Sequence, residues 1–440
     1  MTPQEYLFGL EERGIKFGLS NIRHMLGAVG NPQIEYRTVH VGGTNGKGST
    51  VAFLTSVLEE AGFSVGRYTS PHLVNFSERI VVDDTPVSDP ELDELILLFM
   101  PIAEQMPEIE GLEKPTYFEF GTALAFEHFH RKEVDFAVIE TGLGGRLDST
   151  NVLEPEVVVI TNVDVDHAQY LGDSIQQIAF EKAEIIKPGV PVVTAARHDE
   201  ALRVVREKCR DTGSTLFVDG VDFNYDIEPD QFPMQRMRFS STLGELHDLV
   251  VPLAGAYQGE NAALATMASL ILKKRFPSIT GESIRNGFAS TEWPCRFEPV
   301  RTSPLTIVDG AHNPSAAASL RDEMQKAFPD KRVTLIVAVS GDKNAAGIVS
   351  ALSPIAANII VTRYSLHRSM PAETLFEVAK QYSDKCVLEP NLQAAVARAD
   401  SEASADSLIL IAGSLYLAGE AVELFSSKTS TAGGTEQIRP

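Results

Sequence analysis

The chain has 440 residues, of which 43% are hydrophobic and 22% are charged, and its formal net charge is −22. This length favours two domains, and the acidic charge argues against nucleic acid or an anionic membrane surface as the main partner. Three cysteines lie far apart, and no apolar run approaches the ~18 residues of a membrane span, so we expect a cytoplasmic protein.

Two short helices are expected in residues 1–30, before the stretch around which the chain is organised. Residues 39–50 combine an apolar strand, a glycine-rich turn with one lysine and the start of a helix. Backbone N–H groups in such a turn bind phosphate, and Lys47 can reach the outer phosphates of a nucleotide. The spacing departs from the strict Walker pattern, because Gly48 separates the lysine from Ser49. Nucleotide binding is the working hypothesis.

Polar residues end or follow three later strands, which are expected at 64–68, 136–140 and 157–162. They are Ser70, Glu140 and His167, and the carboxyl ends of parallel strands are where ligands bind. Such ligands beside a phosphate loop can hold a divalent cation. A plain Ser-Pro turn, an exposed carboxylate and a core histidine remain the alternatives.

Lys182 falls on a helix expected from residue 178, where periodicity alone predicts a solvated lysine. Residues 215–252 read as a small β-rich part. Asn261 lies at the start of an alanine-rich helix. Its amide would either cap that helix or contact the edge of a purine base. From residue 304 a second series of strands and helices begins, with Asp309 and His312 after its first strand.

The sequence therefore predicts an α/β protein with two domains. An N-terminal P-loop ATPase-like domain, 1–296, has a parallel central sheet and the small β-rich part. A smaller Rossmann-like domain occupies 297–427, and a polar tail, 428–440, is expected to be disordered.

Several motifs coincide in order with one family. The chain resembles folylpolyglutamate synthase, including the bacterial form that also has dihydrofolate synthase activity, within the muramyl-ligase superfamily of ATP-dependent amide-forming ligases. The matching pieces are the residues 40–49, 68–73, Glu140 with 144–146, 166–167, 181–183, Trp293-Pro294 with Arg296, 309–314 and 413–417. They cover nearly the whole chain, and the lysine-Gly-Ser order of the loop is typical of the folate branch.

The resemblance implies ATP as cofactor, with Mg²⁺ and a possible second cation. Its nucleotide-binding positions are Gly43, Thr44, Asn45, Gly46, Lys47, Gly48, Ser49, Asn261, Arg296 and Asp309. Its metal positions are Ser49, Ser70, Glu140, His167 and Lys182, where the lysine is carbamylated by CO₂ in this family. Catalytic roles fall on Lys47, Lys182, Asp309 and His312. This overturns the surface reading of Lys182.

The implied substrates are L-glutamate and a folate or dihydropteroate, joined through an acyl phosphate by a monomeric enzyme. A peptidoglycan-precursor ligase and a non-catalytic nucleotide switch are the alternatives. Three positions depart from the family pattern: Glu184 and Cys295 stand where small residues are usual, and Tyr257 where histidine is common.

Overall fold

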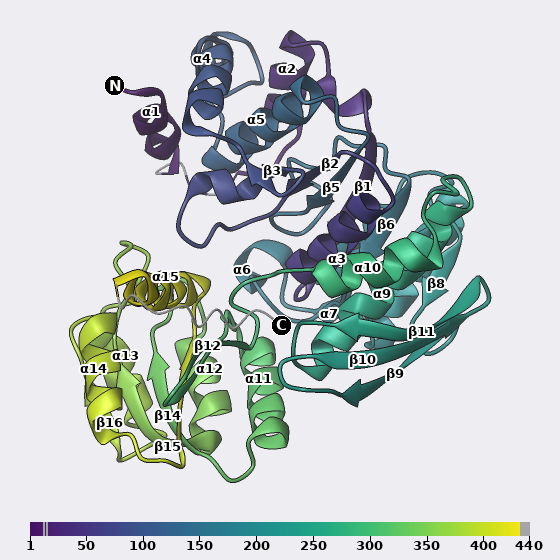
Figure 1. Ribbon diagram of the computed structural model, residues 1–440. Coiled ribbons are helices and arrows are strands. Elements are labelled where there is room, and N and C mark those ends of the chain that lie inside the picture. The colour runs from purple at the N-terminus through teal and green to yellow at the C-terminus, as the bar shows by residue number, and fades with distance from the viewer. Residues whose placement is uncertain (12–13, 15, 432–440) are drawn as a thin grey trace. The chain divides into compact units, whose positions relative to one another are not determined.

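The computed structural model describes residues 1–11, 14 and 16–431, which form two compact units (Figure 1). The first comprises Met1–Pro229, Gln235–Pro252 and Tyr257–Glu292, and the second comprises Asp230–Met234, Leu253–Ala256 and the described residues from Trp293 onward. Both are α/β structures, so the expected class is confirmed. Among the described residues, no helix is both long and apolar enough to cross a membrane.

The first unit is built on a mostly parallel sheet, which has eight strands in the described part of the chain. Buried β-branched residues dominate its central strands, as expected when both faces of a parallel sheet are covered. In spatial order the strands are β4 (Thr85–Pro86), β3 (Ile80–Val82), β2 (Val65–Tyr68), β5 (Phe136–Glu140), β1 (Arg37–Gly42), β6 (Val157–Ile160), β7 (Val192–Thr194) and β8 (Leu216–Val218). Among these described strands only β3 runs in the opposite direction, and it pairs antiparallel with both β2 and β4.

Helices cover both faces of this sheet. One face packs on α1 (Pro3–Gly9), α2 (Ser20–Ala28), α4 (Asp89–Gln105) and α5 (Tyr117–Arg131) at one end, and on α7 (Ile175–Ala183) and α8 (Asp199–Thr212) at the other. The opposite face carries α3 (Lys47–Glu60), against which α10 (Gly281–Ser290) packs. Helices α6 (Ala168–Leu171) and α9 (Ala256–Lys273) complete the unit. The sequence reading had missed α6 and α10.

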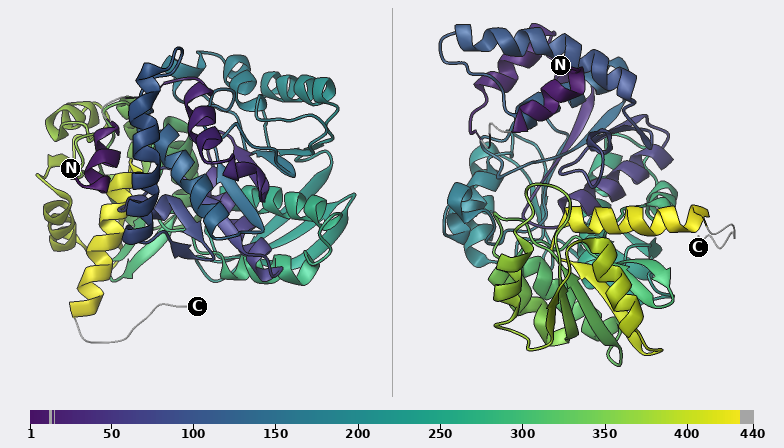
Figure 2. Two further views of the ribbon diagram at one scale, coloured as in Figure 1. Left: turned by 90° about the horizontal axis from the view of Figure 1, so that it is seen from above. Right: turned by 90° about the vertical axis from the view of Figure 1, so that its left-hand side faces the viewer.

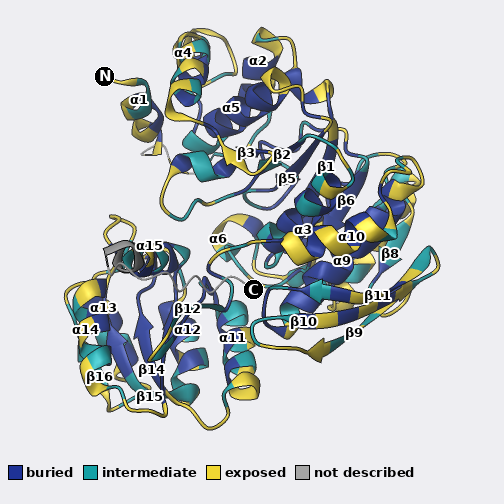
Figure 3. Ribbon diagram, in the orientation of Figure 1, coloured by how far each residue is buried: buried dark blue, intermediate teal, exposed yellow. Residues whose placement is uncertain are grey.

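The β-rich segment divides between two sheets. β8 joins the main sheet, whereas β9 (Phe223–Pro229), β10 (Gln235–Ser241) and β11 (Gly244–Val251) form an antiparallel sheet of three strands within the described residues. Residues of β10 alternate between buried and exposed, because one face of this sheet is open to solvent (Figure 3).

Buried Glu119 shows how a charge is accommodated in the first unit. It begins α5 in a capping box, where its carboxylate accepts the N–H and the hydroxyl of Thr116 at 2.8 and 3.0 Å. The amide of Asn21 donates a third bond at 3.3 Å. These three bonds offset the cost of burying the carboxylate.

The second unit has a six-stranded sheet in the described residues, parallel except for β12. Its spatial order is β12 (Glu298–Thr302), β13 (Leu305–Val308), β17 (Ser407–Ala412), β14 (Arg332–Val337), β15 (Ala356–Val361) and β16 (Cys386–Leu388). Helices flank both faces (Figure 2): α11 (Pro314–Ala327), α12 (Ala345–Leu352) and α13 (Ala372–Ala379) on one, α14 (Leu392–Glu402) and α15 (Leu415–Thr431) on the other. The disordered tail was expected to begin at residue 428, but α15 extends to Thr431. The rest of the expected tail lies outside the described residues.

The contact between α3 and α10 provides a test of this packing. A Cβ added at Gly287 would lie 2.6 Å from the backbone N and Cα of Val57, so alanine would force the two helices apart. We expect Gly287→Ala to lower the free energy of unfolding by about 1–3 kcal/mol, measured by circular dichroism in urea. Gly27→Ala, at an exposed position of α2 where nothing lies within 4 Å of the added Cβ, is the control and should be neutral or stabilising. Equal stability of the two variants would contradict the packing.

Candidate active site

The phosphate loop lies at the centre of the main sheet. β1 leads into it and pairs with β5 on one side and β6 on the other, all parallel. The loops that follow β2, β5, β1 and β6 are therefore consecutive along the carboxyl edge of the sheet. This order brings together the strand ends that carry Ser70, Glu140 and the glycine-rich turn, as the sequence predicted.

Two glycines allow the loop to approach its neighbours closely. Gly43 has φ 141°, and a Cβ there would lie 1.9 Å from the hydroxyl of Thr161. Gly46 has φ 83°, and its Cβ would lie 2.2 Å from Oδ1 of Asn261. Both conformations favour glycine, and any side chain would also collide with a neighbour.

The loop after β6 holds the phosphate loop from one side. The Thr161 hydroxyl donates to the carbonyl of Asn45 at 2.6 Å, and the Asn162 side chain accepts the Asn45 N–H at 2.9 Å. The Thr44 hydroxyl is 3.0 Å from the N–H of Asp164. Sequence reasoning had missed these supporting roles, although their place directly after a buried strand was a usable signal.

Lys47, Glu140 and Ser70 come together at the loop. The Lys47 amine lies 3.9 Å from the Glu140 carboxylate and donates to the Thr44 carbonyl at 3.1 Å. The other Glu140 oxygen accepts the N–H of Ser70 at 3.0 Å. Glu140 is buried, with 5% of its surface exposed, so the alternative of a solvated strand-end carboxylate is wrong.

Lys182 is buried against the same loop. Its amine donates to the carbonyl of Gly43 at 2.7 Å, and only 4% of the residue is exposed. Burial, with a further contribution from the nearby Lys47, lowers the pKa of Lys182 to about 7. The solvated lysine predicted from helical periodicity is wrong, because α7 turns this side chain toward the sheet edge.

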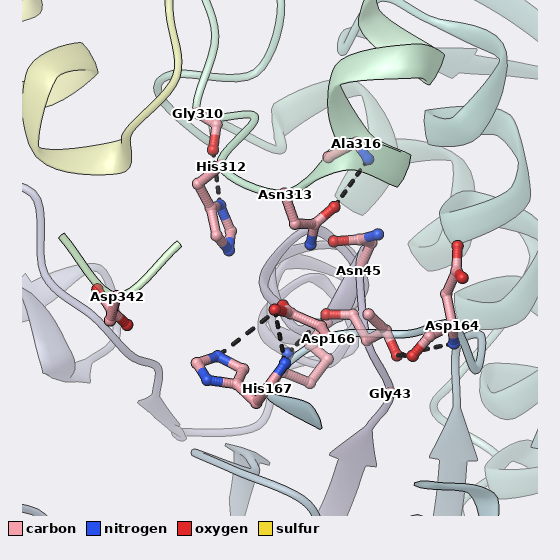
Figure 4. A network of polar contacts seen from close by, with 12 residues as sticks. Gly43, Asn45, Asp164, Asp166, His167, Gly310, His312, Asn313, Ala316 and Asp342 are labelled. Atoms are coloured by element: carbon pink, nitrogen blue, oxygen red, sulfur yellow. Dashed lines mark hydrogen bonds and ion pairs between the residues drawn. The ribbon is translucent and has the colours of Figure 1, made fainter. Parts of the chain in front are cut away.

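The remaining predicted residues of the first unit occupy different surroundings. Ser49 is buried in the first turn of α3, and Asn261 is buried on α9, where its Nδ2 donates to Gln258. His167 has φ 51°, and its Nε2 lies 3.8 Å from the carboxylate of its neighbour Asp166 (Figure 4). The approach of His167 to Glu140 stays a prediction.

A buried polar chain supports the second glycine-rich loop. Nε2 of His40 lies 2.8 Å from the Thr150 hydroxyl, which donates to Asp148 at 2.5 Å. The other Asp148 oxygen accepts the N–H of Leu143 at 2.7 Å. Burial, helped by Lys187, lowers the pKa of His40 to about 3, so this histidine is neutral. The chain links β1 to the loop that follows Glu140.

The second unit places its predicted residues around one strand end. Asp309 follows β13 and accepts two backbone N–H groups, from Phe297 at 2.8 Å and Ala311 at 2.7 Å. His312 Nδ1 lies 2.8 Å from the Gly310 carbonyl (Figure 4); a carbonyl only accepts, so Nδ1 carries the proton. Arg296 donates to the Cys295 carbonyl at 3.0 Å. That Asp309 and His312 face the first unit stays a prediction.

The shifted pKa of Lys182 predicts a pH dependence of stability. Between about 7 and the ordinary value of 10.5, the unfolded chain binds a proton that the folded chain lacks. The free energy of unfolding should therefore rise with pH by up to about 1.4 kcal/mol per unit in this window, and not below it. We expect wild type to gain stability over Lys182→Met between about pH 7.5 and about pH 9.5 in CO₂-free urea titrations. A constant difference would contradict the lowered pKa.

Known proteins resemble both units of the chain. A model of the Mur ligase middle domain matches residues 41–269, and one of the Mur ligase glutamate ligase domain matches residues 295–415. The chain is 36% identical over 418 residues to the dihydrofolate synthase/folylpolyglutamate synthase of Bacillus subtilis, covering 94% of this chain and 96% of that one. It is 37% identical over 396 residues to the folylpolyglutamate synthase of Lacticaseibacillus casei, covering 90% and 91%.

A solved structure extends this similarity to the fold. Mycobacterium tuberculosis folylpolyglutamate synthase, complexed with ADP and AMPPCP, superposes with a TM-score of 0.88 at 29% identity, over 99% of both chains. The chain therefore belongs to the Mur ligase family of ATP-dependent ligases, and within it to the folylpolyglutamate and dihydrofolate synthases.

Proposed function

We propose that this protein uses ATP to join L-glutamate to a folate through an acyl phosphate. A carboxylate oxygen of the folate attacks the γ-phosphorus of ATP, and ADP leaves. The glutamate amine then attacks the acyl carbon, so that an amide forms and phosphate is released. The step needs ATP because a carboxylate is a poor electrophile, whereas an acyl phosphate has a good leaving group. Dihydropteroate is a second acceptor of the same chemistry.

The observation that supports this most strongly is that Lys47, Glu140 and Lys182 lie together at the carboxyl edge of the main sheet. The relatives of the chain are synthases of this kind. An acidic protein needs local positive charge to bind ATP, and two amine side chains flank the glycine loop. Lys47 would offset negative charge on the transferring phosphoryl group. The loop after β6 would keep the backbone donors of the loop in place.

The residues at this edge fit a magnesium ion. A buried carboxylate, Glu140, lies beside Ser70, and hydroxyl and carboxylate oxygens are ligands that Mg²⁺ prefers. No three His, Cys, Asp or Glu residues cluster as a metal site in the described chain. The predicted metal ligands would not form such a cluster, because only Glu140 and His167 among them are of these residue types. The remaining predicted ligands are Ser49, Ser70 and Lys182. When bound, the ion would neutralise phosphate charge.

Lys182 fits the carbamate that the resemblance implies. Carbamylation consumes a neutral amine and CO₂ and releases a proton, leaving a carboxylate-like group on Nζ. An ordinary lysine is almost fully protonated at neutral pH, but one with a pKa of about 7 is not. The change would turn a buried amine into an anion beside Lys47, where it would pair with that lysine or hold a water or metal.

Two alternatives are weaker. A peptidoglycan-precursor ligase would share the chemistry, but the relatives named above are folate enzymes. A nucleotide switch without turnover would not explain the buried Glu140 and Lys182 beside the loop. The expected monomeric state and cytoplasmic location stay predictions.

The role of Lys47 is tested by removing its amine. We expect Lys47→Ala to lose at least about 10²-fold in ADP formation, since one preorganised charge at a phosphoryl transfer is removed. ADP formation by wild type should require both an acceptor, supplied as dihydropteroate or tetrahydrofolate, and glutamate. Lys274→Ala, at an exposed lysine after α9, serves as the control. Retained acceptor-dependent ADP formation in Lys47→Ala would rule out the assignment.

The carbamate predicts a labelled signal. In ¹³C-bicarbonate the wild type should show a carbamate resonance that Lys182→Met lacks, and it should weaken as the pH falls below about 7 because the amine is protonated. Activity should decrease in CO₂-depleted buffer and recover when bicarbonate is added. Identical spectra of wild type and Lys182→Met would refute carbamylation.

A further inference from the structure

Arg79 is a buried guanidinium whose charge no neighbouring carboxylate balances. It ends the 3-10 helix Phe76–Arg79, and only 7% of its surface is exposed. Its Nε donates to Nδ1 of His72 at 3.0 Å, and the guanidinium lies 5.7 Å from the ring centroid of Phe76 and 5.1 Å from that of Tyr117. No Asp or Glu forms an ion pair with it in the part of the chain that the structure describes.

His72 does not supply the missing charge. Its Nδ1 accepts the hydrogen bond from Arg79, and an imidazole ring is either neutral or cationic, so it cannot balance a positive charge. Arginine stays protonated in proteins, and burying an unpaired charge is costly. The two aromatic faces offset a part of that cost. A charge retained under these conditions points to an anion that is absent from the free protein.

The location of Arg79 connects it to the candidate site. Its carbonyl accepts the N–H of Thr69 at 3.1 Å, so it lies directly beside Ser70, whose own N–H binds Glu140. The hydroxyl of Tyr68 is within electrostatic range of both Arg79 and Glu140. The two Nη atoms form no hydrogen bond within the described residues, and they are not fully enclosed.

We propose that Arg79 binds a carboxylate of the folate acceptor. The inference rests on the proposed function, since that reaction requires an acceptor acid beside Glu140. The guanidinium presents its Nη donors as a planar fork, which matches a carboxylate in two parallel hydrogen bonds. Tetrahydrofolate offers a reacting γ-carboxylate and an α-carboxylate, whereas dihydropteroate has only the carboxylate that reacts.

A pair of variants separates this role from a structural one. Arg79→Met keeps the bulk and removes a charge that is unpaired in the free protein, so we expect an unchanged or higher Tm. Its KM for tetrahydrofolate should rise at least tenfold, with the KM for ATP unchanged. Arg67→Met is the matched control, because Arg67 on β2 has Glu59 and Asp84 as charged neighbours. That variant should lower the Tm and leave the KM for the acceptor unchanged.

The choice of acceptor identifies the carboxylate. A higher KM for both dihydropteroate and tetrahydrofolate assigns Arg79 to the reacting carboxylate, and a higher KM for tetrahydrofolate alone assigns it to the α-carboxylate. Unchanged KM values for every acceptor that wild type uses, or a lower Tm with unchanged affinity, would overturn the proposal.

Two further measurements keep the test decisive. Arg79→Lys retains the charge without the fork, so it should give an intermediate KM at normal Tm if Arg79→Met does not fold. Calorimetric titration of tetrahydrofolate into wild type and Arg79→Met reports binding without turnover. A wild type that binds this acid but forms no product would contradict the proposed function alone, and equal affinity of the two proteins would contradict the role of Arg79.

Discussion

The hydrogen bond from Lys182 to the carbonyl of Gly43 is the constraint on which the site depends. A phosphate loop must keep its backbone donors pointed at a ligand while its own carbonyls are satisfied elsewhere. Here Lys182 satisfies Gly43 from α7, and Thr161 satisfies Asn45 from the loop after β6. The arrangement places an amine with a lowered pKa next to Lys47. The same placement therefore supports the loop and, because it buries the amine beside Lys47, lowers the pKa of Lys182.

The sequence predicted the parts of the site that follow from a parallel sheet. Ser70, Glu140 and the glycine loop share an edge because β2, β5 and β1 are neighbours with a common direction. The position of Lys182 could not be predicted in this way, because it lies on a helix. Helical periodicity does not indicate whether a long amine side chain extends to the end of a strand. Only the family resemblance identified it. The supporting residues Thr161 and Asn162 were missed because short polar side chains are common in loops.

The second series of strands is expected to begin at residue 304, so the prediction misses β12, which ends at Thr302. β12 contains Pro299 and charged residues and forms an edge strand with a register shift, so its sequence resembles that of a linker.

Of the three departures from the family pattern, Glu184 is accommodated with φ −70° and pairs with Lys208 at 2.6 Å. Cys295 instead has φ 61°, a conformation that costs a non-glycine residue about 1–2 kcal/mol. Phe297 is also left-handed, and its bond to Asp309 holds the segment around Arg296 in place.

The acyl phosphate is the central claim, and isotope transfer tests it most directly. The acceptor acid, labelled with ¹⁸O in the reacting carboxylate, would be incubated with the protein, ATP and glutamate, and the released phosphate analysed by mass spectrometry. Attack of the carboxylate on ATP followed by amide formation predicts one ¹⁸O atom in each phosphate and one retained in the amide. Unlabelled phosphate, released with amide formation, would contradict the account.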